Sequence, residues 1–553
     1  MKKKFLGLTI GLVAALPMFV NADEVSSETF NECMTATGTK TCQLTENIEI
    51  ASSVEVKGNI TLDLAGYQIT SSATTAIKVV SGSLNVKDTS NDSKGKIEVS
   101  GEAFRMGTKG VADNNKDTAV LTIEKGVDII STNDSCVVIY AGTLNTAGNL
   151  ATMNGHFATI TGSGNEHGTV INVTDGLVSN ATQVAIYQPQ NGTTTIDGGT
   201  ITGTSGVEVR AGKLTVNGGT ITSIIKNDAE VTVSPNGSGS TTSGVGIAVA
   251  QHTTLNPIEV VVNGGTVKGL VALYESNPQK NSATDIKKIK ITVKGGTLET
   301  TKEGNEVVFS ENNLITVEAG EFSGELPEDL TTPEDSKVYE VEVEKENGET
   351  ETKYVVATEE KVENLPYETE VPVTVEELKE ELEELKKELE KVNEEELSGA
   401  DLKEYQAVKK MVTILDGKNI VSLHNINYGS FIDGNYVVDS DQSELKEAVK
   451  VILTLPTNLP KVKEGYVRKY SVLRSHMNTN QEFEYTELEA IEKDGKVTFE
   501  TDKFSSYILM YEDVKDTTNP NTFDGISLYM IIASVSLVGL VSLVLFAKKA
   551  KNY

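Results

Sequence analysis

Runs in which apolar and polar residues alternate occupy much of the first half of the chain. The clearest are Ile60–Ile69, Leu121–Ile129 and Val170–Val178, and a glycine interrupts each of them. Alternation with a period of two is typical of a β-strand that buries one face, and glycine accepts the positive φ angle that a sharp corner needs. The pattern therefore predicts strand–turn–strand units with Val, Ile and Leu facing inward and Thr and Asn facing outward.

One version of this unit recurs with a Gly-Gly pair at its corner. The pairs begin at residues 198, 218, 264 and 295, which leaves gaps of 20, 46 and 31 residues. The recurring segments are Thr195–Ile201, Thr215–Ile221, Val261–Val267 and Thr292–Leu298, with a weaker copy at Thr316–Phe322. Repeats of this length mark units that bury their apolar face only by stacking on one another. We predict a parallel β-solenoid over residues 44–325, with roughly ten coils.

The two ends of the chain carry apolar segments of different kinds. Residues 1–22 join Lys2–Lys4, an apolar run and a small residue, Ala22, and are predicted to be a secretory signal peptide or, if uncleaved, an N-terminal anchor. Residues 526–547 carry no charge, and as a helix they would span ~33 Å, enough for a bilayer core. The basic tail at 548–553 then predicts a cytoplasmic C-terminus, so that the rest of the chain lies outside the cell.

The segment that follows the solenoid, residues 326–410, is acidic. Residues 328–396 hold 26 Asp and Glu against 8 Lys, Asn347-Gly348 predicts a hairpin, and Thr374 with Glu377 forms a capping-box pattern that begins a helix. The helix has an apolar seam of heptad type at Leu378, Leu382, Leu385, Leu389 and Val392. Two interpretations stay open, a coiled coil that dimerises a stalk and a helix that packs on its own module.

Residues 411–513 return to alternating runs. These extend from Val449–Leu455 to Tyr507–Tyr511, with a hairpin signal at Asp494-Gly495, and they predict a β-sandwich-like module. Residues 514–525 are polar and are predicted to form a tether between this module and the apolar segment.

Two of the three cysteines lie close together near the predicted mature N-terminus. Cys33 and Cys42 are nine residues apart and form a disulfide if the compartment is oxidising, or remain two free thiols. Residues 23–43 are predicted to cap the open end of the solenoid, with Ser27 as N-cap of a short helix that carries Phe30 and Met34. Cys136 lies in an apolar strand pattern and is predicted to be a buried thiol.

Charge and composition restrict the partners. The net charge is −31, with 80 acidic against 49 basic residues, which disfavours nucleic acids. The chain has no Trp, the usual platform for sugars, although 17 Tyr are present.

Residues 519–523 resemble the sorting signal of Gram-positive cell-wall proteins. The order of parts is a short Pro-Thr motif, an apolar helix and a few Lys, and the motif itself is Asn519, Pro520, Asn521, Thr522 and Phe523. In that family a sortase cleaves after the Thr and joins it to peptidoglycan, so the resemblance implies attachment through Thr522. Asn519 stands where Leu is usual and Phe523 where Gly is usual. The alternative is a plain membrane anchor.

Residues 44–325 resemble adhesin-like surface proteins of gut Firmicutes. Ala185–Gly203 and Gly206–Val216 carry the likeness, which implies a right-handed parallel β-helix of the pectate-lyase type. Val497–Tyr507 is similar to the last module before the anchor in many Gram-positive surface proteins, where that module acts as a stalk. Fold does not fix function, so the resemblance says little about the ligand.

The sequence predicts no catalytic residue, no cofactor and no metal site. Lyases of this fold need clustered acids with an Arg or Lys base, whereas Asp63, Asp175 and Asp197 stand singly near turns. Arg105 and Arg210 are the only Arg in the solenoid. His156, His167 and His252 are isolated in sequence, and a pairing of the first two stays an open alternative.

Three functions compete on these grounds. The first is a displayed adhesin that recognises glycans or proteins, the second is a passive structural rod, and the third is a divergent polysaccharide lyase or hydrolase. Exposed tyrosines such as Tyr140 and Tyr187 would favour binding, acids clustered on consecutive coils would favour an enzyme, and a uniform Thr/Asn face would favour a rod.

Overall fold

The computed structural model describes residues 22–516, except for 92–93, 109–118, 156, 163–167, 236–240, 328–329, 331, 346 and 479–481. The fold is mainly β, and the chain divides into two compact units between Glu359 and Glu360. The predicted sorting motif at 519–523, the predicted membrane helix and almost all of the predicted signal peptide lie outside the described residues. Within those residues, no helix is long and apolar enough to cross a membrane.

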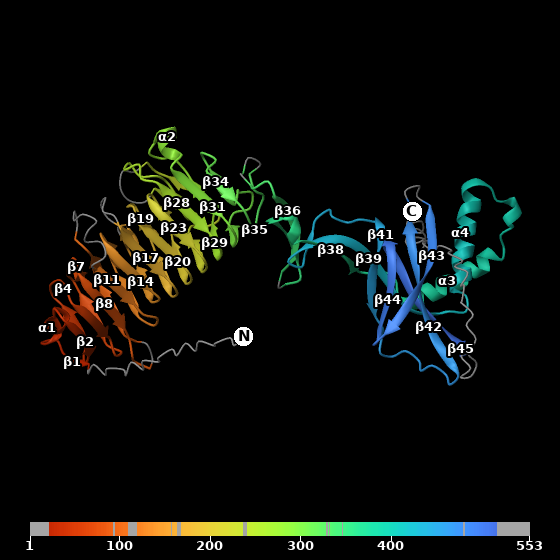
Figure 1. Ribbon diagram of the computed structural model, residues 1–553, viewed down its shortest axis with the longest axis horizontal. Helices are drawn as coiled ribbons and strands as arrows, with labels where there is room; N and C mark the ends of the chain where they lie inside the picture. Colours follow the sequence, from red (N-terminus) through yellow and green to blue (C-terminus); the bar gives the residue numbers. More distant parts are fainter. Residues whose placement is uncertain are drawn as a thin grey trace, which may run out of the picture. The chain divides into compact units, whose positions relative to one another are not determined.

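The N-terminal unit consists of three long parallel sheets, which we call sheets A, B and C. The chain visits them in that order in every turn, and each strand pairs in parallel with the strand one turn later (Figure 1). The described residues hold ten complete A–B–C turns, from β2, β3 and β4 to β31, β32 and β33. This arrangement is consistent with a β-helix, as the repeats predicted.

Within each sheet the strands follow one another in chain order. Sheet A contains β1 (Asp23–Val25), β2 (Thr39–Leu44), β5 (Asn59–Asp63), β8 (Gly82–Lys87), β11 (Ala119–Ile123), β14 (Gly142–Thr146), β17 (Thr169–Val173), β20 (Thr193–Ile196), β23 (Gly212–Val216), β28 (Ile258–Val262), β31 (Ile289–Val293) and β34 (Ile315–Val317). Sheet B contains β3 (Ile48–Ile50), β6 (Gln68–Ser71), β9 (Lys96–Val99), β12 (Asp128–Ser131), β15 (Asn149–Thr152), β18 (Leu177–Asn180), β21 (Thr200–Gly203), β24 (Thr220–Ser223), β29 (Thr266–Gly269), β32 (Thr297–Thr300) and β35 (Gly320–Phe322). Sheet C contains β4 (Val54–Val56), β7 (Thr75–Val79), β10 (Glu102–Met106), β13 (Val137–Ile139), β16 (Ala158–Gly162), β19 (Val184–Gln188), β22 (Val207–Val209), β27 (Val245–Val249), β30 (Val271–Glu275) and β33 (Val308–Ser310).

The core of this unit is a stack of aliphatic side chains. Ile60, Leu84, Leu121 and Leu144 occupy one register position of sheet A in successive turns, and each is at most 1% exposed. Complete burial of such a side chain stabilises the fold by roughly 1.5–3 kcal/mol relative to exposure. Stacking therefore supplies the stability that a single turn lacks.

The corners between sheets A and B follow the Gly-Gly repeat. Only the second glycine of each pair has a positive φ angle, as in Gly219 at 80°. The first glycine is needed for space, because a Cβ on Gly218 would lie 2.6 Å from the carbonyl oxygen of Asp197 in the preceding turn. Close stacking, as well as turn geometry, therefore requires the pair.

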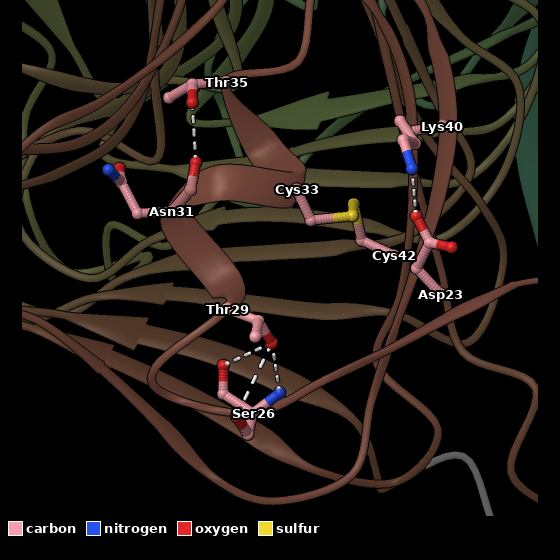
Figure 2. The surroundings of a disulfide bond; sticks show 8 residues. All are labelled: Asp23, Ser26, Thr29, Asn31, Cys33, Thr35, Lys40 and Cys42. Carbon is pink, nitrogen blue, oxygen red and sulfur yellow. Dashed lines mark hydrogen bonds and ion pairs between the residues drawn. A yellow bond between two sulfur atoms is a disulfide. The ribbon is translucent and has the colours of Figure 1, made fainter.

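Helix α1 (Phe30–Met34) covers the first turn and buries Phe30, Cys33 and Met34. A disulfide joins Cys33 to Cys42 on β2 and so ties the helix to sheet A (Figure 2). Ser27 is not the N-cap as predicted, since Thr29 precedes the first helical residue. The backbone N–H and hydroxyl of Ser27 instead donate hydrogen bonds to Glu46, both at 2.8 Å.

At its other end the unit closes with the predicted hairpin, β36 (Ser336–Glu344) and β37 (Thr350–Thr358), whose second strand pairs antiparallel with β35. The remaining short elements are β25 (Thr232–Val233), β26 (Thr242–Ser243), α2 (Ala283–Ile286), and the 3-10 turns η2 (Glu359–Lys361) and η3 (Glu394–Glu396).

The C-terminal unit has three layers. Its larger antiparallel sheet packs against two helices on one face and against a smaller antiparallel sheet on the other. The elements are β38 (Val362–Thr369), α3 (Val375–Leu389), α4 (Gly399–Leu415), β39 (Asn419–Ile432), β40 (Asn435–Val437), β41 (Glu444–Thr454), β42 (Tyr466–Met477), β43 (Phe483–Lys493), β44 (Lys496–Lys503) and β45 (Ser505–Lys515).

Two expectations about the C-terminal half change. The predicted acidic region 326–410 is divided, because its hairpin belongs to the N-terminal unit and α3 to the C-terminal unit. The capping box of Thr374 and Glu377 is present, and the seam of α3 packs on its own unit, with Leu378 and Leu382 buried. The burial of these two leucines agrees with the interpretation of α3 as a helix that packs on its own module. The predicted strand module at 411–513 is the second expectation to change, because the unit also contains the end of α4 together with β39.

Candidate binding face

The outer face of sheet C gathers charged and aromatic side chains. One outward register position runs through consecutive strands from β7 to β33 and is occupied by Lys78, Arg105, Val138, Thr161, Tyr187, Glu208, Ala248, Tyr274 and Phe309. The strands β16, β19 and β27 are buried along their whole length, so other segments of the chain cover the middle of this face.

Sheet A presents a contrasting outer face of regularly spaced hydroxyl and amide groups. One register position carries Thr122, Asn145, Asn172, Thr195 and Thr215 in successive turns. The Asn172 amide donates to the side-chain oxygen of Asn145 at 2.8 Å, and at the corner Asn217 donates to Asp197 at 2.7 Å. These amides bond along the stack, which gives a uniform polar surface.

Arg105 lies near the first turns of sheet C and is paired. Its Nε donates to Glu102 at 2.7 Å, a second guanidinium nitrogen bonds the same carboxylate, and the guanidinium carbon lies 5.9 Å from the centre of the Tyr140 ring. The hydrogen bonds that Arg105 donates to Glu102 raise the pKa of the guanidinium. Arg105 is therefore a fixed cation and is unsuited to act as a base.

Glu208 and Arg210 are completely buried farther along the same face. Glu208 accepts hydrogen bonds from the backbone and hydroxyl of Thr241, at 2.8 and 2.5 Å, and Arg210 Nε donates to the carbonyl of Ala250 at 3.1 Å. Thr241 lies in the Gly- and Ser-rich stretch 234–244, between β25 and β27. Buried charges need such partners, so the pair serves to hold the covering segments on sheet C.

An aromatic pair lies at the last turns of sheet C. The rings of Tyr274 on β30 and Phe309 on β33 stack with centroids 4.6 Å apart and planes 18° apart, and both side chains are half-buried. The neighbouring Glu275 is fully buried and accepts hydrogen bonds from Ser310 and Asn312, both at 2.8 Å. These bonds fix the segment that follows Phe309 and hold the ring in place.

A small pocket of about 170 Å³ opens beside Phe309. Its lining residues are Glu306, Val308, Phe309, Ser310, Asn313, Ile315, Pro327 and Leu330. An aromatic ring and aliphatic walls thus face the polar groups of Glu306, Ser310 and Asn313. Pockets that combine apolar walls with a few polar groups hold small ligands in one orientation.

Several predicted markers take structural roles. Tyr140 and Tyr187 are only 6% and 4% exposed, so these two tyrosines do not form the exposed ladder that would favour binding. Asp63 accepts hydrogen bonds from the backbone of Ala65 and Thr89, both at 3.0 Å, and stabilises a corner. In the described part of the chain, no group of three or more His, Cys, Asp or Glu is arranged to hold a metal ion.

The histidines and the third cysteine add no reactive group to this face. His156 and His167 lie outside the described residues, and the ring of His252 accepts a hydrogen bond from the Thr254 backbone at 3.3 Å. Cys136 is fully buried, and burial raises the pKa of its thiol to about 12. A thiol with this pKa is inert at neutral pH.

Sequence reasoning missed the aromatic pair, although a signal exists. The runs Val271–Tyr274 and Val307–Phe309 are apolar at consecutive positions and so break the alternation that marks the other strands. Such runs indicate strands with apolar groups on both faces.

Comparison with protein-family models, with curated proteins and with solved structures returned no match. The function of this face is therefore inferred from its geometry.

Proposed function

We propose that the chain is a surface-displayed, adhesin-like protein that presents its β-helix for recognition of an extracellular glycan or protein. The observation that carries the proposal is the stack of Tyr274 and Phe309 beside a pocket with polar groups on its rim. The fixed ring offers an apolar face, and the carboxylate of Glu306 and the amide of Asn313 offer hydrogen bonds to hydroxyl or amide groups.

The proposal includes display at the cell wall of a Gram-positive bacterium. Its support is the order of the segments that the sequence predicts: a signal peptide, a right-handed β-helix, a stalk module, the motif around Thr522 and an apolar helix. A sortase would then attach Thr522 to peptidoglycan. The Cys33–Cys42 disulfide agrees with an oxidising, extracellular compartment.

Binding of the full-length chain to arrayed mucin, plant and bacterial glycans and to host matrix proteins tests this function. Phe309→Ala removes one ring of the stack and is expected to weaken retention of the ligand at least tenfold, about 1.4 kcal/mol. Tyr67→Ala is the matched control, since Tyr67 is an aromatic side chain, 37% exposed, at a corner of the early turns. Equal retention by wild type and Phe309→Ala would contradict the assignment of the site.

The uniform Thr and Asn face of sheet A favours a second function, that of a passive rod. Such a rod would hold other groups away from the wall and would retain no component of the array. That outcome would also leave Phe309→Ala indistinguishable from wild type.

A further inference from the structure

We propose that the C-terminal unit carries an acyl-transfer site, built from Ser422, His424 and Glu368, that acts on small neutral esters. The activity is separate from the binding face on the β-helix and does not depend on it.

The three side chains form a hydrogen-bonded series. The hydroxyl oxygen of Ser422 lies 2.7 Å from Nε2 of His424, and Nδ1 of the same ring lies 2.8 Å from a carboxylate oxygen of Glu368. Both distances fall in the range that links a nucleophile to its base and a base to the group that orients it. Nδ1–H donates to Glu368, so Nε2 is left to accept the proton of Ser422.

The backbone explains how the three meet. Ser422 and His424 are two residues apart on β39 and so share one face, while Glu368 lies on β38, whose last paired residue, Thr369, is opposite Asn425. Ser422 therefore lies beyond the end of β38, three residues before Asn425 on β39. The side chain of His424 is 13% exposed and that of Glu368 is 56% exposed, so solvent contacts the site mainly at the carboxylate.

A β-bulge precedes the nucleophile. The register of β39 with β45 passes from Ile420 to Ser422 and leaves Val421 out. Bulges redirect side chains and are frequent beside active sites.

The protonation state of the base is suitable. Burial lowers the pKa of His424, and this effect outweighs the opposing influence of the Glu368 charge. The ring is therefore neutral at pH 7, as a general base must be. Glu368 and the exposed Glu370 disfavour anionic acyl donors.

The reaction follows from these roles. Ser422 Oγ forms a bond to the ester carbonyl carbon while its proton moves to His424 Nε2; the bond to the alcohol oxygen then breaks, and the alcohol leaves with that proton. Water attacks the acyl-Ser422 ester in the same way, giving a carboxylic acid and free Ser422.

A fluorophosphonate probe tests the site on the full-length chain. Ser422 displaces fluoride and becomes phosphonylated, and peptide mass spectrometry locates the adduct. We expect labelling at Ser422 that disappears in Ser422→Ala and slows by ~10²–10⁴-fold in His424→Gln. Ser430→Ala is the control, because Ser430 lies on the same strand and bonds Asn364 at 2.6 Å. Absence of label on the wild type, or label that persists in Ser422→Ala, would overturn the proposal.

A second measurement does not depend on phosphonate chemistry. In Ser422→Cys the imidazole of His424 lowers the thiol pKa, so iodoacetamide at pH 6 should alkylate it at least tenfold faster than the thiol of Ser430→Cys. Equal rates for the two variants would also contradict the proposal.

Discussion

Gly219→Ala probes the stacking of the β-helix at one corner. Gly219 has a φ angle of 80°, and a Cβ there would lie 2.7 Å from the carbonyl oxygen of Gly199 in the preceding turn. The substitution therefore meets two penalties, a strained backbone angle and a clash with the stack. Two other glycines separate these penalties.

Gly348→Ala measures the cost of the backbone angle alone, because Gly348 also has a φ angle of 80° but has no atom within 4 Å of the added Cβ. Gly218→Ala measures the cost of the clash alone, because its added Cβ would lie 2.6 Å from the Asp197 carbonyl oxygen and Gly218 has no positive φ angle. A left-handed angle costs roughly 1–2 kcal/mol and a forced backbone shift roughly 1–3 kcal/mol. We expect about 1–2 kcal/mol for Gly348→Ala and about 2–5 kcal/mol for Gly219→Ala.

Hydrogen–deuterium exchange on the full-length chain measures these costs locally. Amides in β20 to β24 report Gly218 and Gly219, and amides in β36 and β37 report Gly348, since exchange follows the free energy of local opening. The extra clash of about 1–3 kcal/mol corresponds to exchange roughly 5–150-fold faster. If Gly219→Ala accelerated exchange no more than Gly348→Ala does in its own hairpin, close stacking of successive turns would be refuted.

Three further predictions concern other parts of the chain. Burial alone would raise the pKa of Asp88, but hydrogen bonds from Ser90, Gly95 and Gly66 hold it below its usual value of 3.8. Its stabilising contribution is therefore present above pH 3.8 and is lost as the pH falls through the lower, folded-state pKa. Asp88→Asn should thus cost about 1–2 kcal/mol at pH 7 but much less at pH 2 in urea unfolding, and an equal cost at both values would contradict this sign. Replacing Cys33 and Cys42 together by Ser should release α1 at a cost of roughly 2–3 kcal/mol, seen as faster proteolysis of residues 23–38, and unchanged proteolysis would argue against the cap. Leu378→Ala should destabilise the C-terminal unit by about 2–5 kcal/mol without changing the sedimentation coefficient of the native chain, and loss of a dimer would instead favour the coiled coil.

The stacked strands could be predicted because the residues that specify each strand and each corner lie close together in the sequence. Residues such as Leu121 and Ile123 alternate with polar neighbours, and each corner carries its own glycine signal. The same holds for the capping box of Thr374 and for the nine-residue spacing of Cys33 and Cys42, which the structure joins. In each case the pattern depends on residues within one or two turns of the chain.

The remaining features depend on contacts between distant segments. The buried state of Tyr187 follows from segments that cross sheet C, and the unit boundary follows from the pairing of β35 with β37. Helix α4 was missed because the predicted module boundary at 410 falls within it, and its buried positions, such as Met411 and Leu415, were taken with the strand pattern that follows. Ser422 and His424 share a face by their spacing, but only the pairing of β38 with β39 brings Glu368 to them.

The most direct test of the central proposal measures retention and cleavage together. The full-length chain is incubated with mucin, plant and bacterial polysaccharides, with and without Ca²⁺, and both bound polymer and new reducing ends or unsaturated sugars are followed. A displayed recognition surface predicts that at least one polymer is retained and that no such product appears. Product release would contradict the account, and the search for catalytic groups would then turn to the acids of sheet C.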